Sequence, residues 1–301
     1  MYPIKHASRS EFVPVRHLNY HVRVWGKPVP GQAPLVMVHG WMDVGASYQF
    51  VVDALQQGRH VIAPDWRGYG LTEGPVTDNY WFPDYMADLD FLLDHYSPNA
   101  PVDLVGHSMG GNVVMLYAGV RPQRIRRLIN IEGFGLAASK PTQAPGRYAK
   151  WMDELKGLHR GDLTLRPYPD AAGVAGRLMK TNPRLSQDKA DWLAQHWAQA
   201  NAQGQWEILG DPAHKITNAN IYKVEEVQAL YGRITAPTLA VEASDDSLSQ
   251  WWQGKYTLAE YHERLKWVAD CRVAQISDAG HMLHHDQPQQ LAALIEDFLG
   301  Q

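Results

Sequence analysis

The stretch VDLVGHSMGGNVV, residues 102–114, places a single serine between glycines, after an apolar run and before a run of small and apolar residues. Gly106 and Gly110 each lie two positions from Ser108, the spacing of a sharp turn from a strand into a helix. A serine on such a turn takes a strained backbone conformation, and larger neighbours would collide with the adjoining strand and helix. The pattern predicts a hydroxyl held clear of a sheet edge, with a helix N-terminus behind it that can stabilise an oxyanion.

Apolar runs of strand length, rich in Val, Ile and Leu, recur along the chain at 35–40, 60–65, 102–107, 127–133, 238–244 and 271–277. Stretches with helical spacing lie between most of them, at 48–57, 80–96, 112–120, 252–268 and 288–299. Strands that are apolar on both faces and alternate with helices indicate an α/β fold. We therefore expect a mostly parallel central sheet with helices on both faces.

The alternation stops between residues 136 and 221, where the pattern is helical or irregular and no strand-like run is found. This segment contains four tryptophans, Trp151, Trp192, Trp197 and Trp206. Its clearest predicted helix begins after Asn182 and Pro183, with Ser186 as the expected N-cap. We interpret the segment as an insertion into the α/β core.

Four motifs in this order resemble the α/β-hydrolase family: HGW at 39–41 after the third strand, DWRGYG at 65–70 after the fourth, GHSMGG at 106–111, and GHMLHHDQP at 280–288. The resemblance implies a hydrolase core over 1–135 and 222–301, with a helical cap insertion at 136–221. The text flanking the cap is similar to serine hydrolase-like and epoxide-hydrolase-like members. Epoxide hydrolases and haloalkane dehalogenases, however, have aspartate where this chain has Ser108.

A serine hydroxyl needs a histidine as base, and the histidine needs a carboxylate that fixes its tautomer. His281 is the expected base because it follows a strand and a glycine and opens the last helix, as the family's histidine does. The acid is expected between serine and histidine in chain order. Asp245 is favoured by counting three residues from Glu242, which replaces the family's usual glycine, and the alternatives are Asp246 and Glu132.

The oxyanion hole is expected to use the backbone N–H groups of Trp41 and Met109. His281, His284 and His285 also form an H-x-x-H-H spacing that could bind a metal on a helix. Metalloproteases keep a glutamate between their histidines, and we expect no metal and no cofactor here.

The bulk composition excludes several classes of function. The formal net charge of −4 comes without a basic stripe, which argues against nucleic acid as a partner. No segment approaches the about 18 uninterrupted apolar residues of a membrane span, and the N-terminus lacks an apolar signal region. We therefore expect a cytoplasmic protein, and Cys271, the one cysteine, excludes an internal disulfide.

These features together predict a serine hydrolase that cleaves a carboxylic ester of a small-molecule acyl substrate, through an acyl-enzyme on Ser108. The same groups could serve C–C bond hydrolysis or perhydrolysis. A non-catalytic protein that binds a small ligand on the same fold is the alternative from another class. The sequence makes no prediction of the oligomeric state.

Overall fold

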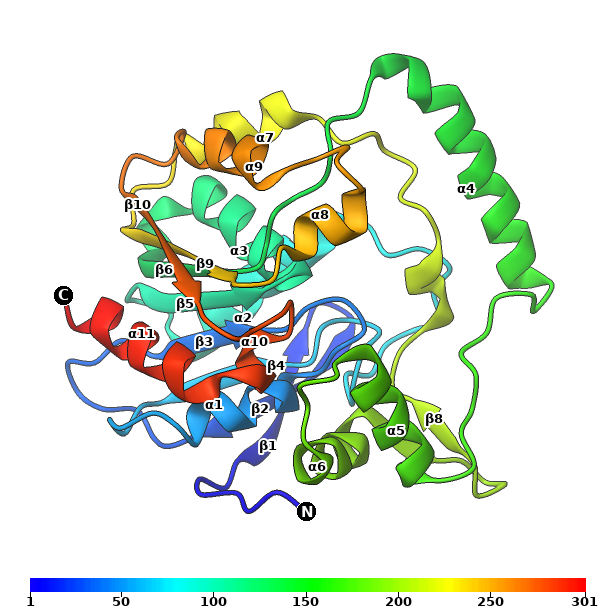
Figure 1. Cartoon of the computed structure of the whole chain (residues 1–301), viewed down its shortest axis with the longest axis horizontal. Helices are drawn as coiled ribbons and strands as arrows, with labels where there is room; N and C mark the ends of the chain where they lie inside the picture. Colours follow the sequence, from blue (N-terminus) through cyan, green and yellow to red (C-terminus); the bar gives the residue numbers. More distant parts are fainter.

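The computed structural model describes residues 1–301 and contains one eight-stranded sheet (Figure 1). The strands follow the spatial order β1-β2-β4-β3-β5-β6-β9-β10. Their bounds are β1 Arg9–Val15, β2 Leu18–Trp25, β3 Leu35–Val38, β4 Val61–Pro64, β5 Val102–His107, β6 Ile125–Ile131, β9 Thr238–Ala243 and β10 Cys271–Ile276. The β1–β2 and β2–β4 pairs are antiparallel, and the pairs from β4 to β10 are parallel. The expected mostly parallel α/β sheet is confirmed.

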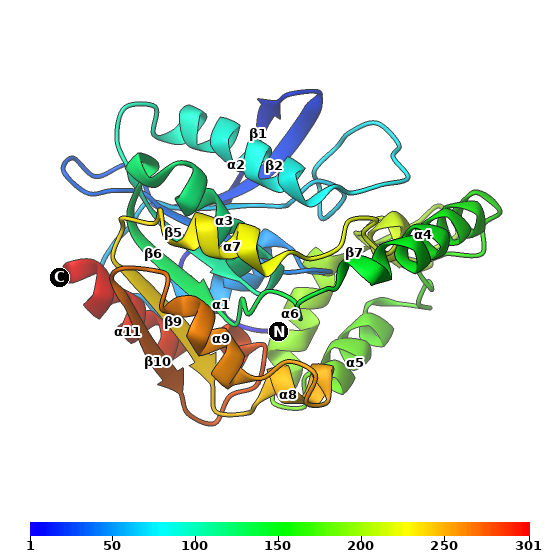
Figure 2. The same cartoon turned by 90° about the horizontal axis from the view of Figure 1, so that it is seen from above.

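Helices cover both faces of the sheet (Figures 1 and 2). One face packs against α2 (Phe82–Tyr96), α3 (Met109–Val120), α7 (Val224–Tyr231) and α9 (Leu258–Leu265) around a large apolar core. The opposite face packs against α1 (Gln49–Val52), α10 (Leu283–Asp286) and α11 (Pro288–Gly300) around a second core. This explains why the central strands are apolar on both faces. None of these helices, nor any other in the chain, is both long and apolar enough to cross a membrane.

The helix expected over residues 252–268 is shorter than predicted, because only α9 (Leu258–Leu265) forms within this range. Helix α8 (Ser247–Trp252) ends at Gln253 and Gly254, which both have positive φ and cannot continue a right-handed helix. Helix α9 starts afresh after Thr257, whose side chain and that of Glu260 form a capping box. The helix expected at 48–57 is likewise reduced to the short α1 and a preceding 3₁₀ turn, Gly45–Tyr48.

The segment between β6 and β9 contains α4 (Ala144–His159), α5 (Ala171–Thr181) and α6 (Gln187–Trp197). In Figure 1, α4 lies apart at the edge of the molecule, whereas α5 and α6 lie together near the short strand β8. The helix expected after Ser186 is confirmed, and its buried Trp192 packs against Phe50. The small sheet of β7 (Ala198–Ala200) and β8 (Trp206–Ile208) was not expected, because three-residue strands are too short to show a pattern.

Candidate active site

The serine lies on the turn between β5 and α3, and its backbone is strained as expected. Ser108 has φ 52° and ψ −115°, outside the regions that residues other than glycine normally occupy. A Cβ on Gly106 would lie 2.3 Å from the carbonyl oxygen of Gly110, and one on Gly110 would lie 2.4 Å from that of Val38. Both glycines are therefore required by close backbone approach, which fixes the direction of the serine hydroxyl.

Two hydrogen bonds join Ser108 to a histidine and a carboxylate from distant parts of the chain. Ser108 Oγ lies 2.9 Å from His281 Nε2, and His281 Nδ1 lies 3.2 Å from Glu132 Oε2. Because an ionised carboxylate can only accept, the pairing with Glu132 places the imidazole proton on Nδ1. The lone pair of Nε2 then faces the serine hydroxyl and can accept its proton.

Glu132 follows β6 and is held rigidly in place. Its Oε1 accepts a hydrogen bond of 2.8 Å from the backbone N–H of Ala243, at the end of the neighbouring strand β9. The side-chain amide of Asn130 bonds to both the N–H and the carbonyl oxygen of Gly133, closing a tight turn around Glu132, which has φ 54°. The carboxylate is 1% exposed, so both of its oxygens are committed to protein donors in a buried site.

Asp245, the acid favoured by the sequence, is not brought to His281. Its two carboxylate oxygens accept hydrogen bonds of 2.7 and 3.2 Å from Arg184. Asp246 caps α8 by accepting from the N–H of Ser249 at 2.8 Å. Glu242, from which the register was counted, instead pairs with His262 at 2.7 Å. Among the three candidates, the structure places Glu132 in the position of the acid, because its side chain alone reaches Nδ1 of His281.

The turn after β3 lies against the nucleophile. A Cβ on Gly40 would lie 3.0 Å from Cβ of Ser108, so the backbone at 39–41 passes close to the serine. Met109 is the first residue of α3, where the N–H groups have no partner within the helix. The indole of Trp41 is largely exposed and donates from Nε1 to the carbonyl oxygen of His214 at 3.2 Å. The expected use of the Trp41 and Met109 N–H groups in an oxyanion hole stays a prediction.

Burial controls the charge of His281. Removal from water lowers its pKa below the ordinary value, against the hydrogen bond and charge of Glu132, which raise it. The exposed ring of Trp251, on α8, meets the His281 ring edge to face at a centroid distance of 4.2 Å. A lowered pKa keeps the imidazole neutral at neutral pH, as a general base must be.

A second group of buried polar side chains lies behind His281. His107 Nε2 donates to the carbonyl oxygen of His281 at 2.8 Å, and the His107 ring lies 4.3 Å from that of His284. Burial lowers the pKa of His107 well below its ordinary value, so this ring stays neutral. Asp43 Oδ2 lies 3.7 Å from His284 Nε2.

Asp43, His107 and His284 are also the residues that could best hold a metal, since their ligand atoms lie within 4.8 Å of one another. The three histidines of the H-x-x-H-H spacing do not form one metal site. His281 faces Ser108, and only His284 belongs to the group of possible ligands. The expectation of no metal stays a prediction.

The sequence profile of the alpha/beta hydrolase fold matches residues 33–288. A serine hydrolase-like protein of Danio rerio is 24% identical over 296 residues, covering 96% of this chain and 88% of its own. A cis-3-alkyl-4-alkyloxetan-2-one decarboxylase of Shewanella oneidensis is 26% identical, covering 88% and 81%. Among solved structures, the thioesterase domain from the curacin biosynthetic pathway superposes with a TM-score of 0.83 and 25% identity, covering 96% of this chain and 99% of that domain. The chain belongs to the α/β-hydrolase family and is an enzyme of hydrolase type.

Proposed function

We propose that the protein is a serine hydrolase that cleaves carboxylic esters of small molecules through an acyl-enzyme. The observation that carries the proposal is the unbroken chain of contacts from Ser108 Oγ through His281 to Glu132. In the first step Ser108 Oγ attacks the ester carbonyl carbon while His281 Nε2 takes the hydroxyl proton. The same proton then passes to the leaving alkoxide, which departs as the alcohol and leaves the acyl group on Ser108.

In the second step a water molecule takes the place of the alcohol. His281 Nε2 accepts a proton from this water, and the resulting hydroxide attacks the acyl carbonyl. The proton returns to Ser108 Oγ as the carboxylic acid leaves. Glu132 stabilises the imidazolium formed in each step, and the N–H groups of Trp41 and Met109 stabilise the negative oxygen of each tetrahedral intermediate.

The proposed substrate class is supported by the chemistry of the site and by the relatives. A thioesterase domain and a serine hydrolase-like protein are among the similar proteins, and both names fit acyl transfer to water. We propose an ester as substrate because its cleavage needs only the residues described above. Residues 136–221 are proposed to act as the cap over this site, and the cytoplasmic location stays a prediction.

Two alternatives remain distinct from ester cleavage. C–C bond hydrolysis or perhydrolysis would use the same three side chains, and the decarboxylase among the relatives illustrates how varied the chemistry of similar chains is. A protein that only binds a ligand would not require Ser108, His281 and Glu132 to be aligned. Their alignment therefore favours an enzyme over a binding protein.

A fluorophosphonate probe combined with an ester assay tests the proposal. The probe should label the wild-type protein at Ser108, and Ser108→Ala should lose both labelling and ester turnover. The expected loss is on the order of 10⁶-fold, the scale found when a protease loses its catalytic serine. Ser186→Ala, at an exposed serine of α6's N-cap, is the matched control and should behave as wild type. Unchanged turnover in pure, folded Ser108→Ala protein would overturn the proposal.

A further inference from the structure

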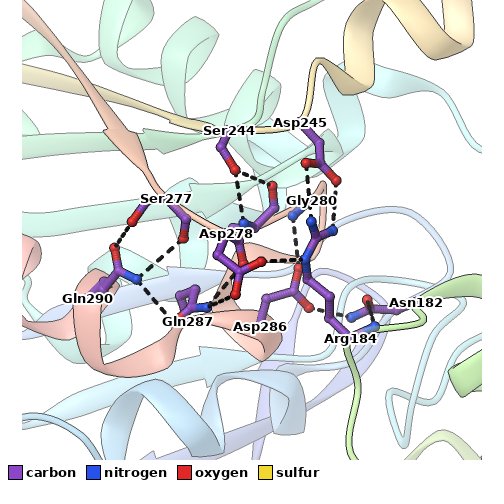
Figure 3. Close-up of polar contacts among 11 residues, drawn as sticks. Asn182, Arg184, Ser244, Asp245, Ser277, Asp278, Gly280, Asp286, Gln287 and Gln290 are labelled. Atoms are coloured by element: carbon purple, nitrogen blue, oxygen red, sulfur yellow. Dashed lines mark hydrogen bonds and ion pairs between the residues drawn. The ribbon is translucent and has the colours of Figure 1, made fainter.

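An arginine from the 136–221 segment, Arg184, reaches across to Asp245 and Asp278 of the core (Figure 3). Arg184 donates from Nη1 and Nη2 to the two oxygens of Asp245, at 2.7 and 3.2 Å, in a bidentate pair. Its Nε donates to Asp278 Oδ1 at 3.3 Å. One guanidinium thus joins the end of β9 to the turn after β10.

A second contact from the same segment is connected to Gly280, the residue before His281, through the side chain of Asp286. Asn182 Nδ2 donates to Asp286 Oδ1 at 2.7 Å, and the other oxygen of Asp286 accepts from the N–H of Gly280 at 2.9 Å. A Cβ on Gly280 would lie 3.4 Å from Arg184 Nη1, so the guanidinium also packs directly against this glycine. Figure 3 shows both contacts meeting at the turn that contains Asp278 and Gly280.

The turn itself is tied to β9 through its backbone. Asp245 N–H donates to the carbonyl oxygen of Ala279 at 3.0 Å, and Ala279 N–H donates to Ser244 Oγ at 3.1 Å. Residues 278–281 are therefore held between the core strand and the side chains of Asn182 and Arg184. Arg184 and Asn182 therefore connect the 136–221 segment to the turn that carries His281.

We propose that Arg184, assisted by Asn182, is a positioning residue that latches the 136–221 segment to residues 278–281 and so fixes the placement of His281. In this latch, the binding partner of Arg184 is Asp245, which follows β9 just as Glu132 follows the neighbouring strand β6. The kinetic part of the proposal rests on the proposed ester hydrolysis, whereas the structural part does not.

The size of the effect is bounded by exposure. The side chains of Arg184 and Asp245 are 36% and 38% exposed, and ion pairs in such positions contribute at most about 1 kcal/mol, or about fivefold in an equilibrium. Local opening of residues 278–281 should therefore become up to about fivefold more frequent without the latch. The loss in kcat cannot exceed the same factor, because only the displaced fraction of molecules is inactive.

Loss of the latch should also change the titration of His281. The groups that face its ring are Glu132, His107, His284 and Asp43, and none of these is removed by a change at Arg184. Burial is what lowers the pKa of His281. A looser turn admits water and weakens this effect, so the acid limb of the pH–rate profile should move to higher pH.

The test compares Arg184→Ala with Arg160→Ala. Arg160 is a matched control because it belongs to the same segment and forms an exposed pair with Asp162, at 2.8 and 3.0 Å, that does not involve the core. Amide hydrogen exchange at 279–281 should be faster, by up to about fivefold, in Arg184→Ala and unchanged in Arg160→Ala. With a minimal acetate ester, kcat should fall by no more than about fivefold at constant KM, and the acid limb of the pH–rate profile should move to higher pH.

Arg184→Lys keeps the charge and should restore part of the protection, whereas Asn182→Ala should accelerate exchange at Gly280. The exchange measurement needs no substrate, so it can succeed even if esters prove to be the wrong substrates. The proposal would be overturned if Arg184→Ala and Arg160→Ala had the same amide exchange rates at 279–281 and the same acid limb of the pH–rate profile.

Discussion

The ends of strands β6 and β9 offer two carboxylates at the same edge of the sheet, and the structure uses them differently. The strands are parallel neighbours, so Glu132 and Asp245 both follow their carboxyl ends. Glu132 is 1% exposed and contacts His281, whereas Asp245 is 38% exposed and contacts Arg184. Position along the sheet therefore does not by itself decide which carboxylate becomes the triad acid.

Hydrogen-bond donors in the surroundings make the difference. The N–H of Ala243 fixes one oxygen of Glu132, and the turn closed by Asn130 fixes its backbone, so the second oxygen faces His281. No backbone N–H fixes the carboxylate of Asp245, and both of its oxygens instead accept from the long side chain of Arg184. A carboxylate becomes a useful partner for a histidine when its other bonds are made by fixed backbone groups.

The largest expected effect distinguishes these two carboxylates directly. Glu132→Gln keeps the shape of the side chain but removes the charge that stabilises the His281 imidazolium, and turnover should fall roughly 10⁴-fold, the scale known from a serine protease. The measurement is kcat with one ester at one pH, after circular dichroism confirms the fold. Glu242→Gln is the matched control, a buried glutamate on the adjacent strand that pairs with His262. Equal losses in both variants would show that a buried charge in general, and not the triad, is responsible.

A much smaller effect is expected for Asp245. Asp245→Asn weakens the pair with Arg184 but leaves the Glu132–His281 bond untouched, so kcat should fall by no more than about fivefold. The assay is the same as for Glu132→Gln, which allows the two losses to be compared directly. A loss of several orders of magnitude would return Asp245 to the role of acid that its place in the sequence suggested.

The smallest effect concerns the titration of His281, which nuclear magnetic resonance can follow without turnover. Burial lowers the pKa of this ring, so the midpoint should lie below the unperturbed value of about 6.5. Glu132 opposes that effect by raising the pKa, and Glu132→Gln should therefore move the midpoint to still lower pH. Asp245→Asn should not lower it. A midpoint that falls in Asp245→Asn but not in Glu132→Gln would reverse the comparison.

The sequence predicted most of the fold because the strands have strong local patterns. The six apolar runs all form strands, and Ser108 and His281, each chosen from a short motif, lie within hydrogen-bond distance. The strands β7 and β8 were missed because three residues cannot display a period. The break at Gln253 and Gly254 depends on a positive φ that glutamine rarely adopts, so it carried little signal.

The acid was harder to predict because its identity depends on side-chain direction. Counting from Glu242 assumes that the loop after β9 follows the usual register, yet Glu242 here binds His262. The useful signal was local and easily overlooked: Asn130 and Gly133 flank Glu132, and an Asn–Gly pair of this kind can close a tight turn. No sequence pattern predicts the pairing of Arg184 with Asp245, because these residues lie 61 positions apart.

The positive φ angles of Ser108 and Glu132 have a consequence for evolution in the laboratory. Both residues occupy backbone conformations, with φ of 52° and 54°, that glycine adopts without strain. Glycine at position 132 would leave the buried N–H of Ala243 without its partner. At Ser108, however, selection for heat resistance alone would reward glycine at the position where the proposed chemistry needs a hydroxyl. A library of this protein sorted only by thermal tolerance should become enriched in inert variants, and each round needs an activity screen to retain the enzyme.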